Sequence, residues 1–102
     1  MTGFATAEVI ISNDVGLHAR PSVKFTKLAK LYPCSVEIAL SSEGPWLDAK
    51  SIVKVMGAKA PKGTRILLRA SGDQSNEAVA ALRALVERHF DEGLGDAGSN
   101  QT

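Results

Sequence analysis

One short stretch combines a potential nucleophile with a potential anion-binding group. His18 stands two residues before Arg20 and three before Pro21, within Gly-Leu-His-Ala-Arg-Pro. A neutral imidazole is a competent nucleophile near pH 7. A planar guanidinium can bind phosphate oxygens through two parallel hydrogen bonds. These residue types at this spacing indicate a site where a histidine accepts a phosphoryl group and an arginine stabilises its charge.

The pattern around His18 predicts that it lies at the start of a helix. Residues 12–16 have the composition of a turn, and apolar residues then recur at helical spacing: Pro21, Phe25, Leu28, Ala29 and Tyr32. A proline is tolerated in a first helical turn, where N–H groups have no intrahelical partner. Those N–H groups and the helix dipole attract anions. A histidine that only caps the helix, without chemistry, is the alternative.

Periodicity predicts the remaining elements. Alternation of apolar and polar residues indicates strands at 5–11, 35–40 and 64–70. After a turn at 41–44, residues 45–49 can form a short strand that closes a hairpin, with Pro45 at a sheet edge or strand start. The first helix ends before Pro33, a short helix runs from Ser51 to Gly57, and a last helix is capped by Asp73 or Ser75. The apolar face of that last helix comprises Ala78, Leu82, Leu85 and Val86, with His89 as one polar interruption. We expect His89 to have a structural role. Strands with one apolar face favour an antiparallel sheet under helices, but their order in the sheet stays open.

Composition narrows the class of protein. The chain has 102 residues, 44% of them hydrophobic and 23% charged, with a net charge of +1. We expect a single domain over residues 1–90 and a disordered polar tail over 91–102. No apolar run or signal pattern indicates a membrane, and the net charge gives no sign of nucleic-acid binding. Cys34, the only cysteine, is expected to be semi-buried. A cytoplasmic monomer without metal or cofactor fits this composition.

These residues resemble the HPr family, the histidine-containing phosphocarriers of the bacterial phosphotransferase system. Asn13 and the stretch 16–21 match the active-site motif, and Lys50-Ser51-Ile52 followed by Met56 matches the regulatory serine segment. Lys62-Gly63 and then Ala70-Ser71-Gly72 match at the expected spacing. The resemblance implies an α+β open-faced sandwich, with a four-stranded antiparallel sheet under three helices in the order β-α-β-β-α-β-α.

The resemblance also implies a function. His18 would accept a phosphoryl group from phosphorylated enzyme I, ultimately from phosphoenolpyruvate, and pass it to an enzyme IIA component. Arg20 would stabilise the phosphate. The protein would be a phosphoryl-transfer relay rather than an enzyme with its own turnover. Partners would dock on the first two helices, at Leu17, Ala19, Lys24, Lys27, Ile52, Val53 and Met56. We otherwise expect Lys24, Lys27 and Lys30 to be solvated.

Ser51 has two compatible interpretations. It is a good N-cap for the short helix, and the resemblance implies phosphorylation there by an HPr kinase/phosphorylase. Departures from the commonest family pattern at Ser22, Val53 and Lys54 are expected to touch the docking surface.

Two other functions remain open from the sequence. The first is a nitrogen-branch or regulatory paralogue that acts in signalling rather than sugar uptake. The second is a binding module that holds an effector on the same surface without phosphoryl transfer.

Overall fold

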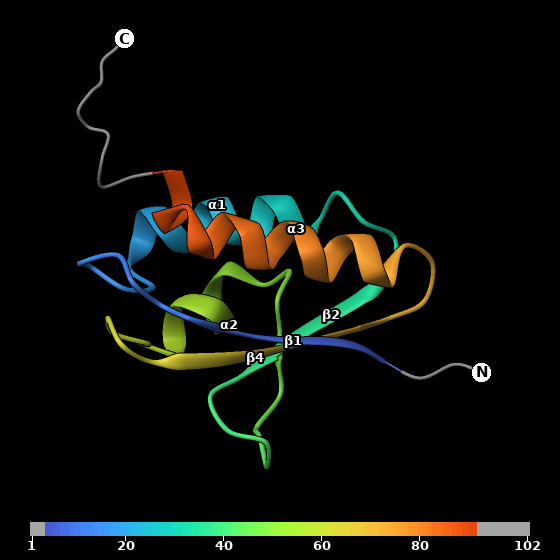
Figure 1. Ribbon diagram of the computed structural model, residues 1–102, viewed down its shortest axis with the longest axis horizontal. Helices are drawn as coiled ribbons and strands as arrows, with labels where there is room; N and C mark the ends of the chain where they lie inside the picture. Colours follow the sequence, from blue (N-terminus) through green and yellow to red (C-terminus); the bar gives the residue numbers. More distant parts are fainter. Residues whose placement is uncertain (1–3, 92–102) are drawn as a thin grey trace, which may run out of the picture.

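The computed structural model describes residues 4–91 as an antiparallel sheet with helices on one face (Figure 1). The strands are β1 (Ala5–Ile10), β2 (Ser35–Ala39), β3 (Leu47–Asp48) and β4 (Arg65–Ser71). Their order in the sheet is β1-β4-β2-β3, and each neighbouring pair is antiparallel. The sheet therefore joins the first strand to the last, which decides the strand order that periodicity left open.

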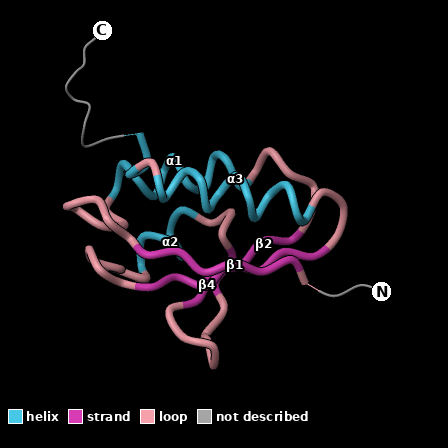
Figure 2. The backbone as a smooth tube through the Cα atoms, viewed as in Figure 1, coloured by secondary structure: helices cyan, strands magenta, loops and turns pink. Residues whose placement is uncertain are grey.

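Three helices and one short turn complete the fold. They are α1 (Ala19–Ala29), α2 (Ile52–Gly57) and α3 (Ser75–Glu87), followed by the 3-10 turn η1 (His89–Asp91). Figure 2 shows the three helices together on one side of the strands. The predicted fold class and the order β-α-β-β-α-β-α are confirmed.

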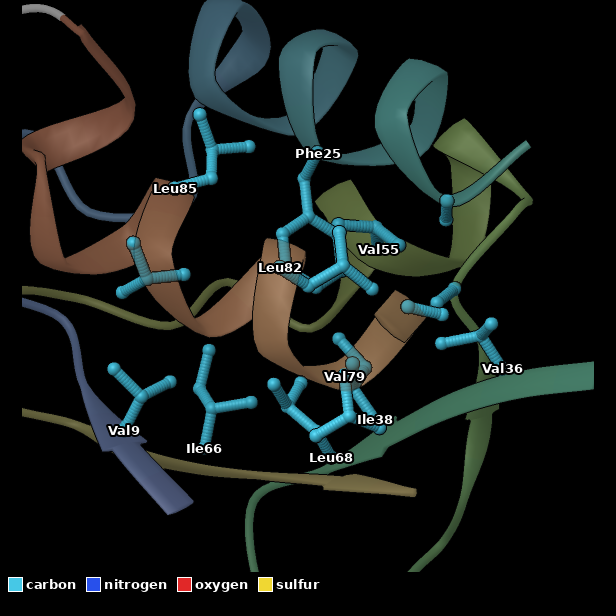
Figure 3. Packing of buried hydrophobic residues seen from close by; sticks show 14 of the residues in the cluster. Val9, Phe25, Val36, Ile38, Val55, Ile66, Leu68, Val79, Leu82 and Leu85 are labelled. Atoms are coloured by element: carbon cyan, nitrogen blue, oxygen red, sulfur yellow. The ribbon is translucent and has the colours of Figure 1, made fainter. Parts of the chain in front are cut away.

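The core lies between the sheet and the helices. Phe25 of α1, Val55 of α2 and Leu82 of α3 are fully buried. They face Ile66 and Leu68 of β4, whose side chains are also buried (Figure 3). Full burial of an aliphatic or aromatic side chain contributes roughly 1.5–3 kcal/mol. One continuous core thus fixes α1 and α2, the two helices on which the predicted site residues lie.

The second hairpin is shorter than expected. Only two residue pairs join β2 and β3, whereas residues 45–49 were predicted to form the strand. Pro45 has no backbone N–H to donate to the sheet, so it cannot extend the ladder. The turn predicted at residues 41–44 is present, because the Gly44 N–H donates to the Ser41 carbonyl at 3.0 Å.

The start of α3 also differs from the prediction. Neither Asp73 nor Ser75 is the N-cap, which is Gln74 in the left-handed region at φ 65° without a side-chain cap. Ser75 is already the first helical residue, and its N–H donates to the Gly72 carbonyl at 3.3 Å. The chain reverses through Gly72, at φ 111°, so backbone geometry rather than a side chain begins this helix.

Helices α1 and α3 both end before the last apolar residue that the sequence pattern assigns to them. Helix α1 ends at Ala29, so Tyr32 packs against the core from the following turn, and Cys34 is fully buried rather than semi-buried. Helix α3 ends at Glu87, and His89 starts a turn of three residues with φ between 57° and 60°. Of the tail predicted to be disordered, only Asp91 is described, and it belongs to η1; residues 92–102 lie outside the described chain.

Candidate functional site

His18 occupies the N-cap of α1, as the sequence predicts. Its backbone is extended, at φ −84° and ψ −169°, and its carbonyl accepts the Ser22 N–H at 3.0 Å. The side chain is exposed and makes no cap hydrogen bond. Most polar N-cap residues use their side chain to satisfy a helix N–H. Here the imidazole is not used in that way, so it is accessible to a reaction partner.

The first turn of α1 provides a positive environment for that imidazole. Arg20 is exposed in this turn, while Pro21 is buried beneath it. Helix α1 is described along its whole length, and its first turn has no acidic residue. The positive end of the helix dipole is therefore not offset by a carboxylate of the same turn. An anion next to His18 would be stabilised by the helix terminus and by the guanidinium together.

The loop before His18 has a conformation that requires glycine. Gly16 has φ 65°, and an added Cβ would lie 2.3 Å from the Ala60 carbonyl oxygen and 2.8 Å from Pro61 Cα. The next residue, Leu17, donates its N–H to the same Ala60 carbonyl at 2.8 Å. This close approach to Ala60 and Pro61 fixes where α1 begins. The sequence shows a turn at 60–63 but no sign that it supports the histidine loop.

Asn13 stabilises the same loop from inside. Its side chain is 4% exposed, and Nδ2 donates to the Gly16 carbonyl at 3.0 Å. The Gly16 N–H donates back to the Asn13 carbonyl at 3.2 Å. The other amide atom, Oδ1, accepts no hydrogen bond from residues 4–91. Asn13 therefore closes the turn before His18 and still has an unused acceptor.

The C-terminal turn contacts the site from the other side. His89 Nδ1 lies 3.3 Å from Ser12 Oγ, and Lys24 donates to the Phe90 carbonyl at 3.1 Å. The Phe90 ring packs edge-on against Phe25, with ring centroids 6.5 Å apart. Lys24 is therefore half-buried, and the expectation that it is solvated is wrong. Nothing in the local sequence pattern indicates these contacts, because the residues lie more than sixty positions apart.

Two residues expected on the docking surface belong to the interior. Leu17 is 3% exposed and is part of the core. Ser22 is fully buried, and its hydroxyl donates to the Leu17 carbonyl at 3.3 Å. Both residues lie where α1 begins, and its inner face packs against the core there. Their side chains therefore have almost no surface for a partner to contact.

Ser51 is the N-cap of α2, as predicted. Its Oγ accepts the Lys54 N–H at 3.3 Å, and its carbonyl accepts the Val55 N–H at 3.0 Å. The preceding residue, Lys50, donates its ammonium group to the Tyr32 carbonyl at 2.7 Å. The start of α2 is thus attached to the turn that follows α1. The serine is half-buried.

Several predicted docking residues do lie at the surface of the two helices. Val53 is 75% and Met56 37% exposed, whereas Val55 between them is buried. Ala19 and Lys27 are exposed on α1, and Ile52 is half-buried. Helices α1 and α2 are in contact, so these side chains belong to adjacent surfaces. A short helix that buries one side leaves the other as an exposed apolar patch.

The described residues, 4–91, also bear on metal binding and on membrane spanning. Within this range no three His, Cys, Asp or Glu side chains form a group that could hold a metal ion. No helix in the same range has the length and apolar composition needed to cross a bilayer.

Comparisons with known proteins point to one family. The family model described as "PTS HPr component phosphorylation site" matches residues 5–88. The phosphocarrier protein HPr of Pseudomonas aeruginosa is 44% identical over 86 residues, which cover 84% of this chain and 94% of that protein. The phosphocarrier protein NPr of Escherichia coli K12 is 36% identical over 84 residues, covering 82% and 92%.

Solved structures show the same likeness. A crystal structure of HPr from Thermoanaerobacter tengcongensis superposes with a TM-score of 0.78 at 32% identity, covering 85% of this chain and 96% of that one. HPr from Bacillus anthracis gives a TM-score of 0.73 at 29% identity, covering 80% and 95%. The residues that the family model matches include His18, the exposed histidine at the start of α1. The chain therefore belongs to the HPr family of phosphocarrier proteins of the phosphotransferase system.

Proposed function

We propose that His18 accepts a phosphoryl group from phosphorylated enzyme I and passes it to an enzyme IIA component. The observation that carries this proposal is the exposed imidazole at the α1 N-cap, which makes no cap hydrogen bond and stands beside Arg20. Membership of the HPr family supports the same role. The protein acts as a relay between two enzymes.

Transfer of the phosphoryl group needs no covalent catalyst in this protein other than the imidazole of His18. An unprotonated ring nitrogen of His18 attacks phosphorus, the new N–P bond forms, and the bond from phosphorus to the donor breaks. Phosphoryl transfer depends mainly on positioning and on stabilising charge on the phosphate oxygens. Arg20 and the N-terminal end of α1 supply that stabilisation, while the hydrogen bonds of Gly16 and Leu17 hold the loop in place.

The test is phosphorylation with purified enzyme I and phosphoenolpyruvate, followed by intact-protein mass spectrometry. We expect the wild type to gain one phosphate that is labile in acid and stable in alkali. His18→Ala should gain none. His89→Ala is the matched control, since it removes the other histidine of the chain, and it should still be phosphorylated. Labelling of His18→Ala would refute the assignment, and an unlabelled wild type would favour the effector-binding module.

The second half of the relay needs its own measurement. Phosphorylated protein, freed of enzyme I, is mixed with a purified enzyme IIA domain. We expect loss of the phosphate from this protein to match its gain by the IIA domain. Hydrolysis without gain by the IIA domain would show that this domain is not the acceptor.

A regulatory role for Ser51 is the second part of the proposal. A phosphate added there would sit at the N-terminal end of α2, where negative charge is electrostatically favourable. It would also lie two residues from Val53, on the surface expected to contact enzyme I. The fold would then persist while docking weakened. Incubation with an HPr kinase/phosphorylase and ATP should label the wild type and leave Ser51→Ala unlabelled; labelling of both would place the modified residue elsewhere.

The nitrogen branch is a second candidate pathway. Relatives named NPr match 82% of this chain at 36–38% identity, alongside relatives named HPr at 41–44%. The discriminating measurement is the rate of His18 phosphorylation by sugar-branch enzyme I and by its nitrogen-branch counterpart at equal concentration. A much faster rate with one donor assigns the branch.

A further inference from the structure

Strand β1 forms one edge of the sheet and, in the part of the chain that the structure describes, pairs with β4 alone. Just after the strand, the Ile11 N–H donates to the Thr64 carbonyl at 2.9 Å, which is the direction of β4. The backbone groups of successive residues in a strand point to alternate sides. The N–H and C=O groups of Thr6, Glu8 and Ile10 therefore point away from β4 and form an edge that another strand can extend.

The two edges of the sheet are protected to different degrees. Folded proteins commonly protect an edge strand by keeping it short or by placing lysine or proline in it. The other edge strand, β3, has only two residues, and Pro45 shortly before it has no N–H to offer a further strand. Strand β1 has six residues, Ala-Thr-Ala-Glu-Val-Ile, with neither lysine nor proline. Its edge is thus left open to pairing.

The exposed side chains of β1 form a pattern that is complementary to itself when reversed. Phe4, just before the strand, and Ile10, at its end, are 54% and 53% exposed. The Phe4 ring lies against the guanidinium of Arg69, 4.7 Å from Cζ to the ring centroid, on the sheet face that the helices leave uncovered. Thr6 and Glu8 lie between the two apolar residues and are also exposed. An antiparallel copy of this segment would place apolar opposite apolar and threonine opposite glutamate.

Helix α3 leaves room for a second copy at this edge. It packs on both β1 and β4, so it is set back from the outer side of β1. Glu87 of α3 lines a hollow of about 450 Å³ together with Val9 and Ile10, which identifies the helix face that looks over the edge. Ala80 and Ala84 occupy that face at helical spacing, and their side chains are small. Two such helices can therefore approach to about 8–10 Å, the usual distance between packed helices.

We propose that two copies of this chain associate weakly by antiparallel pairing of their β1 edges, with Ala7 facing Ala7 of the second copy across a twofold axis. Each Phe4 then lies opposite Ile10 of the other copy, and each Thr6 lies opposite Glu8. An axis at Glu8 would place two carboxylates opposite each other, and an axis at Thr6 would separate Phe4 from Ile10. No residue of α1 or α2 takes part, so the proposal goes beyond phosphoryl transfer and does not depend on it. At high protein concentration, this dimer would replace the monomer expected from the sequence.

The first measurement is sedimentation velocity of the full-length protein as its concentration is raised. We expect a shift from monomer to dimer with a dissociation constant below about 1 mM. The second measurement locates the contact by isotope-filtered NMR on an equal mixture of labelled and unlabelled protein. We expect intermolecular contacts between the Phe4 ring and the Ile10 methyl groups. These contacts cannot arise within one copy, because the two residues lie at opposite ends of the strand.

Charge at Thr6 tests the register, because this position faces Glu8 of the other copy. Thr6→Lys should tighten the dimer about fivefold and Thr6→Glu should weaken it about fivefold, since each change acts at two symmetric cross-strand pairs. Thr6→Pro removes an outward N–H and should weaken the dimer at least about tenfold. The matched controls are Ser35→Lys and Ser35→Glu, which should leave the dimer unchanged because Ser35 is exposed on β2, away from this edge. Thermal unfolding of each variant confirms that it is folded.

Three results would overturn the proposal. The first is a monomer at every concentration for both the wild type and Thr6→Lys. The second is a dimer that Thr6→Lys and Thr6→Glu affect equally, which would place the contact elsewhere or in another register. The third is a dimer that does not dissociate on dilution, which would show a strand exchanged between the copies instead of two edges that pair.

Discussion

His18 and Ser51 hold the same position in two helices, but only the serine uses its side chain as a cap. Ser51 Oγ accepts the Lys54 N–H, whereas the imidazole of His18 makes no such bond. A cap stabilises a helix by about 1 kcal/mol. Helix α1 forgoes that contribution and instead has an extensively buried inner face, including Phe25 and Ala29. The site is thus free for chemistry because packing holds the helix.

Gly16→Ala should disrupt the site through the backbone. The left-handed φ of 65° and the 2.3 Å approach to the Ala60 carbonyl cannot accommodate a methyl group without a shift. We expect a loss of at least about 2 kcal/mol in the free energy of unfolding and much slower phosphorylation of His18. Gly57→Ala is the matched control, since its Cβ meets open space in a helix, and it should be neutral or slightly stabilising. Urea unfolding of both variants measures the difference, and equal stabilities would contradict the strain.

Arg20→Lys should slow phosphoryl transfer without changing the fold. Lysine keeps the positive charge but lacks the planar pair of donors that matches phosphate oxygens. We expect the rates of phosphorylation and of transfer onward to fall by about tenfold or more, the effect of losing one oriented charge contact. The melting temperature should stay the same because Arg20 is exposed. Wild-type rates in both directions would show that the arginine does not orient phosphate.

At the scale of elements, α2 depends on its cap and its packing. The helix has six residues and includes β-branched Ile52, Val53 and Val55, which have weak helix propensity. Val55 is fully buried, and the Lys50–Tyr32 hydrogen bond fixes the segment that precedes the helix. These contacts hold in place a helix too short to be stable alone.

Charge at Ser51 should therefore affect docking more than folding. Ser51→Asp retains a good N-cap, so its melting temperature should hardly change, yet its phosphorylation by enzyme I should weaken. The defect should shrink at high salt, because screening reduces repulsion of an acidic partner surface. Ser51→Ala should lose about 1 kcal/mol of stability but keep its phosphorylation rate. If both variants react at the same rate at low salt, charge at this position does not control docking.

At the scale of the whole molecule, the C-terminal turn η1 connects three parts of the fold. Phe90 is fully buried against Phe25, its carbonyl accepts a hydrogen bond from Lys24, and His89 contacts Ser12 in the loop that follows β1. Three consecutive residues with positive φ are costly for L-amino acids, at about 1–2 kcal/mol each. Burial of Phe90 and the Arg88–Asp91 ion pair, at 2.9 Å, offset that cost.

The Arg88–Asp91 pair gives the turn a pH dependence. The hydrogen bond from Arg88 lowers the pKa of Asp91 below its ordinary value. Because the folded pKa is lower than the unfolded value of about 3.9, the pair stabilises the protein at neutral pH. That contribution is lost as the pH falls through the lowered pKa. Asp91→Asn should therefore have a slightly lower melting temperature than wild type at pH 7, and the same one at about pH 2.

The control for this prediction is Glu43→Gln, which removes an exposed carboxylate that has no ion pair within residues 4–91. Its melting temperature should follow that of the wild type at every pH. A difference between Asp91→Asn and wild type that stays constant from pH 7 to pH 2 would show that the pair does not couple folding to protonation.

The sequence by itself determined the features that depend on neighbouring residues. Alternation located the strands, and the turn before Pro21 placed His18 at a helix start. Ser51 was recognisable as a cap because capping joins residues three positions apart. The fold class followed from the order of these elements together with the family resemblance.

Only the tertiary structure decided which distant segments meet. It placed β4 between β1 and β2, buried Leu17 and Ser22, and bound Lys24 to the Phe90 carbonyl. It also brought the Ala60 carbonyl against the loop before His18. These contacts join residues tens of positions apart, so they depend on how the elements pack around the core. Local periodicity has no information about that packing, because it reports one element at a time.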